Sequence, residues 1–152
     1  MIEFKRFLPE HLDGAAPRND VGASAILASS QEYLDALAAC IPAVSAFKDN
    51  TFLGCAGIGV LWPGVAEAWM LLTPTIDKLT THERGIVGLR IARSIRLAVK
   101  EYRLHRLQTT VLRGDDRARG FIKWLGFEYE GDMVCYGPDG STYMRYSKLW
   151  LS

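Results

Sequence analysis

The sequence lacks a long apolar run, paired cysteines and an excess of charge of one sign. No stretch approaches the roughly 20 apolar residues that a membrane-spanning helix needs, and the N-terminal residues lack the charged-then-apolar order of a signal peptide. Cys40, Cys55 and Cys135 are scattered and odd in number, which argues against a disulfide framework and a zinc site. We therefore expect a soluble, cytoplasmic protein with reduced thiols and no membrane contact.

Charge and histidine placement exclude further classes of protein. The 18 Lys and Arg residues against 17 Asp and Glu leave a formal net charge of +1, too little to recruit nucleic acid through a whole-molecule field. His11, His82 and His105 show no ligand spacing, and no grouping of Cys, His and Asp suggests a nucleophilic triad. We expect neither a metal ion nor a nucleic-acid partner.

The sequence does contain enough apolar residues for one core. Of its 152 residues 49% are hydrophobic, so we expect a single domain over residues 1–152. Apolar and β-branched runs bounded by turn residues predict strands at 2–8, 41–48, 51–62, 65–73, 107–112, 127–136 and 141–149. Caps and helical periodicity predict helices at 9–13, from 29–32 to 39, from 80 to 102 and at 115–125, and residues 14–24 suggest a loop. This order predicts an α/β fold, a mixed sheet with helices on both faces.

The longest predicted helix has two different faces. Thr80 and Glu83 have the spacing of a capping box at its start. One face is apolar, and the other carries the basic residues Arg90, Arg93, Arg96, Lys100 and Arg103. A solvated surface and a phosphate-binding surface both remain open for this basic face.

Two segments carry a family resemblance. Residues 115–127 resemble the signature of the GNAT superfamily, the GCN5-related N-acetyltransferase-like proteins, with a closing Leu-Gly-Phe that Glu130 and Gly131 continue. Residues 66–73 are similar to the fourth strand of that family, and Glu67 stands where many members have a catalytic base. The order of elements fits the family over nearly the whole chain. The resemblance implies the GNAT acyl-CoA N-acyltransferase fold.

A narrower resemblance concerns bacteriophage proteins. Residues 69–73, 123–127 and 136–140 are similar to GNAT-like proteins of tailed bacteriophages, including a small internal virion protein of short-tailed phages. This resemblance implies a phage-encoded protein of the host cytoplasm or the virion. Such a protein would have a structural or host-interaction role without catalysis.

The GNAT resemblance implies an acetyltransferase with acetyl-CoA as its co-substrate. The acceptor would be an amine on a small molecule or a protein, Glu67 would be the general base, and a homodimer is plausible. The pantetheine arm would lie along the fourth strand and the diphosphate at the start of the following helix. The implied cofactor contacts are Met70, Leu71, Leu72, Thr73, His82, Arg84, Gly85, Val87, Gly88 and Asp115.

The cofactor segment departs from the family pattern of Gln or Arg, then Gly three residues later, then Gly or Ala. Its best match is His82, Gly85 and Val87, which implies a degenerate loop. Gly85 and Gly88 permit close approach to phosphate or tight helix packing equally well. Asp115 replaces the usual Asn and is expected to cap its helix ahead of contacting a cofactor.

The catalytic groups are also open to two interpretations. Glu67 is the one carboxylate in an apolar strand, so it is either a buried base or a solvated residue near a strand end. Ile122 stands where the family often has a tyrosine that acts as the acid, and isoleucine cannot donate a proton. The possible substitutes are water and the tyrosines Tyr102, Tyr129, Tyr136 and Tyr143.

Overall fold

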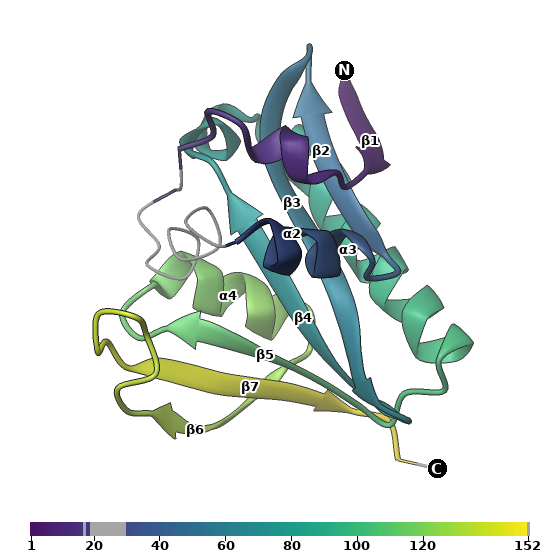
Figure 1. The fold of residues 1–152 in the computed structure, drawn as a ribbon, viewed down its shortest axis with the longest axis vertical. Helices are drawn as coiled ribbons and strands as arrows, with labels where there is room; N and C mark the ends of the chain where they lie inside the picture. The colour runs from purple at the N-terminus through teal and green to yellow at the C-terminus, as the bar shows by residue number, and fades with distance from the viewer. Residues whose placement is uncertain (17, 19–29, 152) are drawn as a thin grey trace.

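A seven-stranded mixed sheet forms the centre of the protein (Figure 1). The computed structural model describes residues 1–16, 18 and 30–151. The strands are β1 (Ile2–Arg6), β2 (Ala43–Lys48), β3 (Thr51–Trp62), β4 (Val65–Leu72), β5 (Arg106–Leu112), β6 (Glu128–Met133) and β7 (Tyr143–Leu149), in the order β1-β2-β3-β4-β5-β7-β6. Strands β4 and β5 pair in parallel, and the other neighbouring strands pair antiparallel.

Helices cover both faces of this sheet. The described helices are η1 (Pro9–Leu12), α2 (Gln31–Ala38), η2 (Pro74–Lys78), α3 (Thr81–Glu101) and α4 (Asp116–Trp124). Ile95 of α3 and Ile122 of α4 share one buried cluster with Leu107 of β5. On the opposite face, Leu37 of α2 joins a second cluster with Leu71 of β4. Figure 1 shows α2 and α3 on opposite sides of β3. The predicted α/β fold with helices on both faces is confirmed.

Three helices begin at caps that the sequence predicted. The hydroxyl of Ser30 accepts a hydrogen bond from the amide of Tyr33 at 3.3 Å, at the start of α2. Thr80 and Glu83 form a complete capping box before α3. The Asp115 carboxylate accepts from the amide of Ala118 at 3.1 Å at the start of α4. Each cap gives an acceptor to an amide that the helix itself cannot satisfy.

Several boundaries differ from the prediction. The strand predicted over 65–73 ends at Leu72, because Pro74 begins the short helix η2, which the sequence did not predict. The strand predicted over 127–136 ends at Met133, and Cys135 adopts a φ of 59° that leaves the extended conformation. Most of the predicted loop at 14–24 lies outside the described residues. Among the described helices, none is long and apolar enough to cross a membrane.

Candidate functional site

Strands β4 and β5 separate soon after they meet. Their pairing covers residues Val65 to Glu67 of β4, although β4 continues to Leu72. Just past the last pair, the Thr109 hydroxyl donates to the carbonyl oxygen of Ala68 at 3.0 Å. A side chain thus replaces the next bond of the sheet, and the strands diverge beyond it.

The divergence leaves part of the β4 backbone without a partner strand. The carbonyl oxygen of Ala68 faces β5, and the carbonyl oxygen of Leu72 accepts from the amide of Arg18 at 3.0 Å. Because alternate residues of a strand direct their peptide groups to the same side, Met70 between them also faces the gap. No described strand pairs with Met70 on this side. An extended ligand carrying amide groups can therefore add to β4 here.

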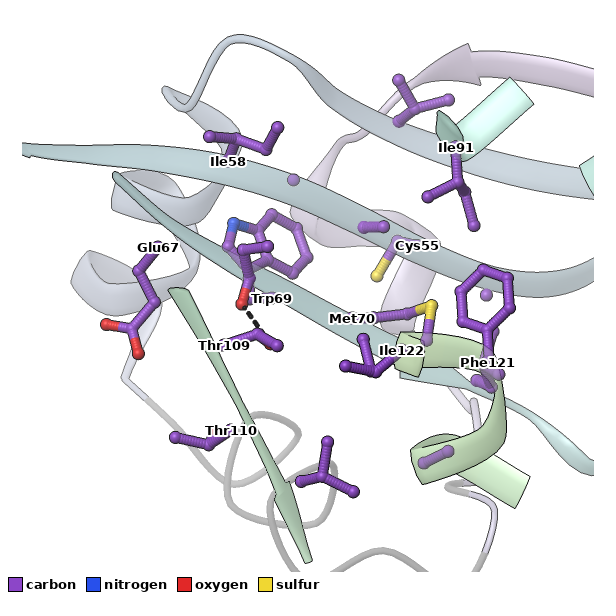
Figure 2. Close-up of a pocket in the computed structure, with 18 of the residues that line it drawn as sticks. Cys55, Ile58, Glu67, Trp69, Met70, Ile91, Thr109, Thr110, Phe121 and Ile122 are labelled. Carbon is purple, nitrogen blue, oxygen red and sulfur yellow. Dashed lines mark hydrogen bonds between the residues drawn. The ribbon is translucent and has the colours of Figure 1, made fainter. Parts of the chain in front are cut away.

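A cavity of about 800 Å³ lies at this gap and is lined from both faces of the sheet. Tyr33 and Trp69 line it on the side of α2, whereas Ile91 and Phe121 line it on the side of α3 and α4. Figure 2 shows Glu67 at one end of the labelled residues and Phe121 at the other, with Thr109 and Ile122 between them. Both faces of the sheet thus contribute to a single site.

Glu67 lies inside β4 and forms an ion pair. One of its carboxylate oxygens accepts from Nη1 of Arg145 on β7 at 2.8 Å, and the two side chains are 32% and 20% exposed. The carboxylate belongs to the α2 side of the sheet, because Trp69 and Leu71, two and four residues later, pack there. Glu67 is therefore a half-buried, ion-paired carboxylate at the cavity. Its exposure is intermediate between the buried base and the solvated residue that the sequence left open.

Two tyrosines lie near this carboxylate although the sequence separates them widely. Tyr33 comes from α2 and Tyr136 from the connection between β6 and β7, and both line the cavity. Burial raises the pKa of the Tyr33 phenol, and Tyr136 and Glu67 raise it further through charge repulsion. Sequence analysis missed Tyr33 and Arg145, because neither residue belongs to a recognisable motif.

Trp69 forms part of the cavity wall on the same side. Its indole ring covers Gly57, where an added Cβ would lie 2.4 Å from a ring carbon, and Phe7 meets the ring edge-on at 5.5 Å. The indole Nε1 is buried and has no hydrogen-bond partner among the described residues. A buried donor without an acceptor is costly, so this N–H is suited to a water molecule or a ligand atom.

The other tyrosines considered as proton donors are placed differently. The Tyr129 hydroxyl donates to Asp132 at 3.0 Å, and this hydrogen bond is the main reason that its pKa is raised. Tyr102 packs against the core cluster under α3. Tyr136 and Tyr143 both line the cavity; Tyr136 is 51% exposed and Tyr143 is 5% exposed. Ile122 is buried in the core beneath α4.

The start of α3 is satisfied by its own side chains. Glu83 accepts from the amide of Thr80, and the amide of Glu83 donates to the Thr80 hydroxyl. The hydrogen bond from Lys48 is the main cause that lowers the pKa of Glu83, followed by the Thr80 amide. Since the first amides of a helix have no intrahelical acceptor, those of Thr81 and His82 remain for another partner.

The remaining predicted cofactor contacts take varied positions around the gap. Leu71 is fully buried, Leu72 packs against a small cluster with Val87, and Thr73 donates to the carbonyl oxygens of Phe52 and Leu53. The guanidinium of Arg84 donates to the carbonyl oxygens of Leu79 and Asp77. Gly85, Val87 and Gly88 lie inside α3, and a Cβ on Gly88 would lie 3.4 Å from the Trp124 ring. Gly85, Val87 and Gly88 thus belong to a helix and to its packing against neighbouring side chains.

Cys55 also lines the cavity. Burial raises the pKa of its thiol to about 12, so it is protonated at neutral pH. All three cysteines are unpaired. No group of three or more His, Cys, Asp or Glu side chains that could hold a metal ion occurs in the described part of the chain.

The fold can be compared with known proteins. No protein-family model and no curated protein matches the chain. Among solved structures, Ard1 from Thermoplasma volcanium has a TM-score of 0.74 at 14% identity, covering 99% of each chain. A GNAT-family acetyltransferase from Bacillus anthracis has a TM-score of 0.68 at 13% identity, covering 97% of this chain and 94% of that one. The protein yncA from Salmonella typhimurium, solved with its cofactor acetyl-CoA, has a TM-score of 0.69 at 12% identity, covering 97% and 93%. The chain therefore has the fold of the GNAT acetyltransferases.

Proposed function

We propose that this protein is an N-acetyltransferase that transfers an acetyl group from acetyl-CoA to a primary amine. The observation that supports this proposal is the gap between β4 and β5, where the unpaired backbone of Met70 and the carboxylate of Glu67 border the same cavity. A pantetheine arm contains amide groups and can bond to Met70 as an added strand would. The three unpaired cysteines agree with a cytoplasmic protein.

The reaction requires a neutral amine, a fixed thioester, an acceptor for the proton that the amine loses and a donor for the proton that the thiolate gains. The amine nitrogen forms a bond to the thioester carbon, the carbon–sulfur bond then breaks, and the thiolate leaves. In our proposal Glu67 accepts the proton of the amine, directly or through water. Arg145 holds the Glu67 carboxylate in place through its 2.8 Å hydrogen bond. Tyr136, which lines the cavity and is half-exposed, or water would protonate the thiolate.

The phosphates of the cofactor would lie at the start of α3. The amides of Thr81 and His82 are the ones that the capping box leaves without an acceptor, and a helix N-terminus favours anions. His82 is exposed at this position. Arg84 would act by holding the preceding turn, through its bonds to Leu79 and Asp77.

A second candidate function is a GNAT-shaped phage protein that has lost catalysis and serves a structural or host-interaction role. Two observations favour it. Glu83 places a carboxylate in the capping box where a diphosphate would bind, and Ile122 is a buried core residue at the position expected for the acid. Acetyl-CoA binding separates the two candidates.

The test is calorimetric titration with acetyl-CoA, followed by an assay of thiol release with amines. We expect saturable binding that His82→Glu weakens about tenfold, because the new charge faces the phosphates. Leu97→Glu is the matched control, since it adds the same charge at an exposed position farther along α3. Glu67→Gln should retain binding and lower kcat by about 10² to 10⁴. Absence of binding at millimolar acetyl-CoA would reject the transferase and favour the second candidate.

A further inference from the structure

The α2 side of the cavity contains very little charge. Its lining includes Tyr33, Leu37, Cys40, Trp69, Tyr136 and Pro138. Of all the described residues that line the cavity, the charged ones are Glu67, Arg90 and Asp115. Arg90 belongs to α3 and Asp115 caps α4, so both lie on the opposite side of the sheet. Glu67 is therefore the one charged group that the described lining offers to an acceptor on the α2 side.

The partner of Glu67 limits the charge that an acceptor can carry. Arg145 already neutralises this carboxylate and is not part of the described lining. A second ammonium group on the acceptor would find no further carboxylate, and an acceptor carboxylate would find no unpaired cation in the described lining. Burying such an unpaired charge is costly. The electrostatics therefore favour an acceptor with a single amine and no other charge.

The aromatic side chains complement such an acceptor. The phenols of Tyr33 and Tyr136 border the cavity near Glu67, and both are about half-exposed. Trp69 supplies an indole wall held in place over Gly57. Aromatic faces attract an ammonium group and also pack well against an apolar or aromatic body. An apolar environment further lowers the pKa of an amine, which promotes the neutral form that attacks.

We propose that the acceptor is a monoamine in which a single primary amine is attached to an uncharged, preferably aromatic body. This inference rests on the proposed acetyltransferase function and adds the class of its substrate. The body of the acceptor lies between Tyr33, Tyr136 and Trp69, and its amine lies toward Glu67. Polyamines and free amino acids are poor acceptors.

Four small amines test this class by changing one property at a time. 2-Phenylethylamine is the reference, and L-phenylalanine differs from it by an added carboxylate. n-Butylamine lacks the ring, and 1,4-diaminobutane differs from n-butylamine by a second amine. We expect kcat/KM, measured by thiol release from acetyl-CoA, to be at least about tenfold higher for 2-phenylethylamine than for L-phenylalanine, and at least about tenfold higher for n-butylamine than for 1,4-diaminobutane. Equal or better use of the amino acid or the diamine would overturn the inference and leave the acetyltransferase proposal standing.

Variants connect the preference to the named residues. Tyr33→Ala should raise KM for 2-phenylethylamine several-fold and leave acetyl-CoA binding unchanged. Tyr136→Ala should raise the same KM and, where Tyr136 rather than water protonates the thiolate, lower kcat as well. Tyr129→Ala is the control, because Tyr129 is outside the described lining and bonds to Asp132. If Tyr129→Ala has the same effect as the other two variants, the proposed location is wrong.

Direct binding separates failure of the substrate class from failure of the reaction. Calorimetric titration with 2-phenylethylamine, with and without CoA, requires no turnover. Binding of 2-phenylethylamine that Tyr33→Ala weakens several-fold, in a protein that acetylates no amine, would support the inference about the pocket and reject the transferase. Absence of both binding and turnover of 2-phenylethylamine, in a protein that binds acetyl-CoA, would reject the substrate class alone. Absence of acetyl-CoA binding as well would reject both proposals.

Discussion

Replacing Gly85 and Gly88 of α3 with alanine tests whether these glycines serve helix packing or close approach to phosphate. Both lie inside a helix, where Gly→Ala contributes about 0.8–1.0 kcal/mol of stability from helix propensity. A Cβ on Gly85 would meet nothing within 4 Å. A Cβ on Gly88 would lie 3.4 Å from the Trp124 ring and 3.8 Å from Phe121, which is ordinary van der Waals contact, and Trp124 is 58% exposed and can adjust.

We therefore expect Gly85→Ala to raise the free energy of unfolding by about 1 kcal/mol and Gly88→Ala by about 0.5–1 kcal/mol. Urea denaturation measures both values, provided that the m-value stays constant. Gly57→Ala is the contrasting control, because its Cβ would lie 2.4 Å from the Trp69 ring and should cost about 1–3 kcal/mol.

The same variants decide between packing and phosphate binding. If the glycines only permit a well-packed helix, acetyl-CoA binding should not change in Gly85→Ala or Gly88→Ala. A stable variant that loses its affinity for acetyl-CoA would show that the backbone must approach the phosphates closely, and the packing explanation would be refuted. Loss of stability in Gly85→Ala would contradict the structure of α3 itself.

Three further measurements follow from the structure. Asp115→Ala should lower the free energy of unfolding by about 1 kcal/mol through loss of the α4 cap, and an unchanged value in urea denaturation would argue against the cap. Iodoacetamide at pH 8 should modify the exposed Cys135 well before Cys55, whose buried thiol has its pKa raised to about 12; peptide mapping showing equal rates would contradict this. Burial lowers the pKa of His11 in the folded state, so the unfolded chain binds its proton first as the pH falls. Stability should therefore decrease as the pH drops through about 6.5, and His11→Asn should reduce this slope in thermal denaturation between pH 8 and pH 5.

Several features of this protein could be predicted from local sequence because their causes are local. The strand at Thr51–Trp62 has the predicted bounds, since turn residues precede and follow an apolar run. The caps at Ser30, Thr80 and Asp115 depend on side chains within three residues of the amides that they bind. The fold class followed from the order of such elements.

Other features depend on residues that are far apart in the sequence. Glu67 was singled out as a candidate base, but its ion pair joins it to a residue 78 positions away, on a strand that does not neighbour β4. The ends of β4 and β6 also differ from the predicted ends, because Pro74 begins a helix and Cys135 turns the chain. No local pattern reports such contacts or conformations.

The sequence by itself determined the strands, the helix caps, the apolar faces of the helices and the placing of a single carboxylate in β4, because periodicity and short-range hydrogen bonds set these features. Only the tertiary structure decided how far β4 and β5 pair before they separate and which side chains surround Glu67. Tyr33, Arg145 and Tyr136 come near this carboxylate through the packing of α2, β7 and the β6–β7 connection on one face of the sheet. The physical reason is that strand order and helix packing, rather than sequence distance, set which side chains meet across a sheet.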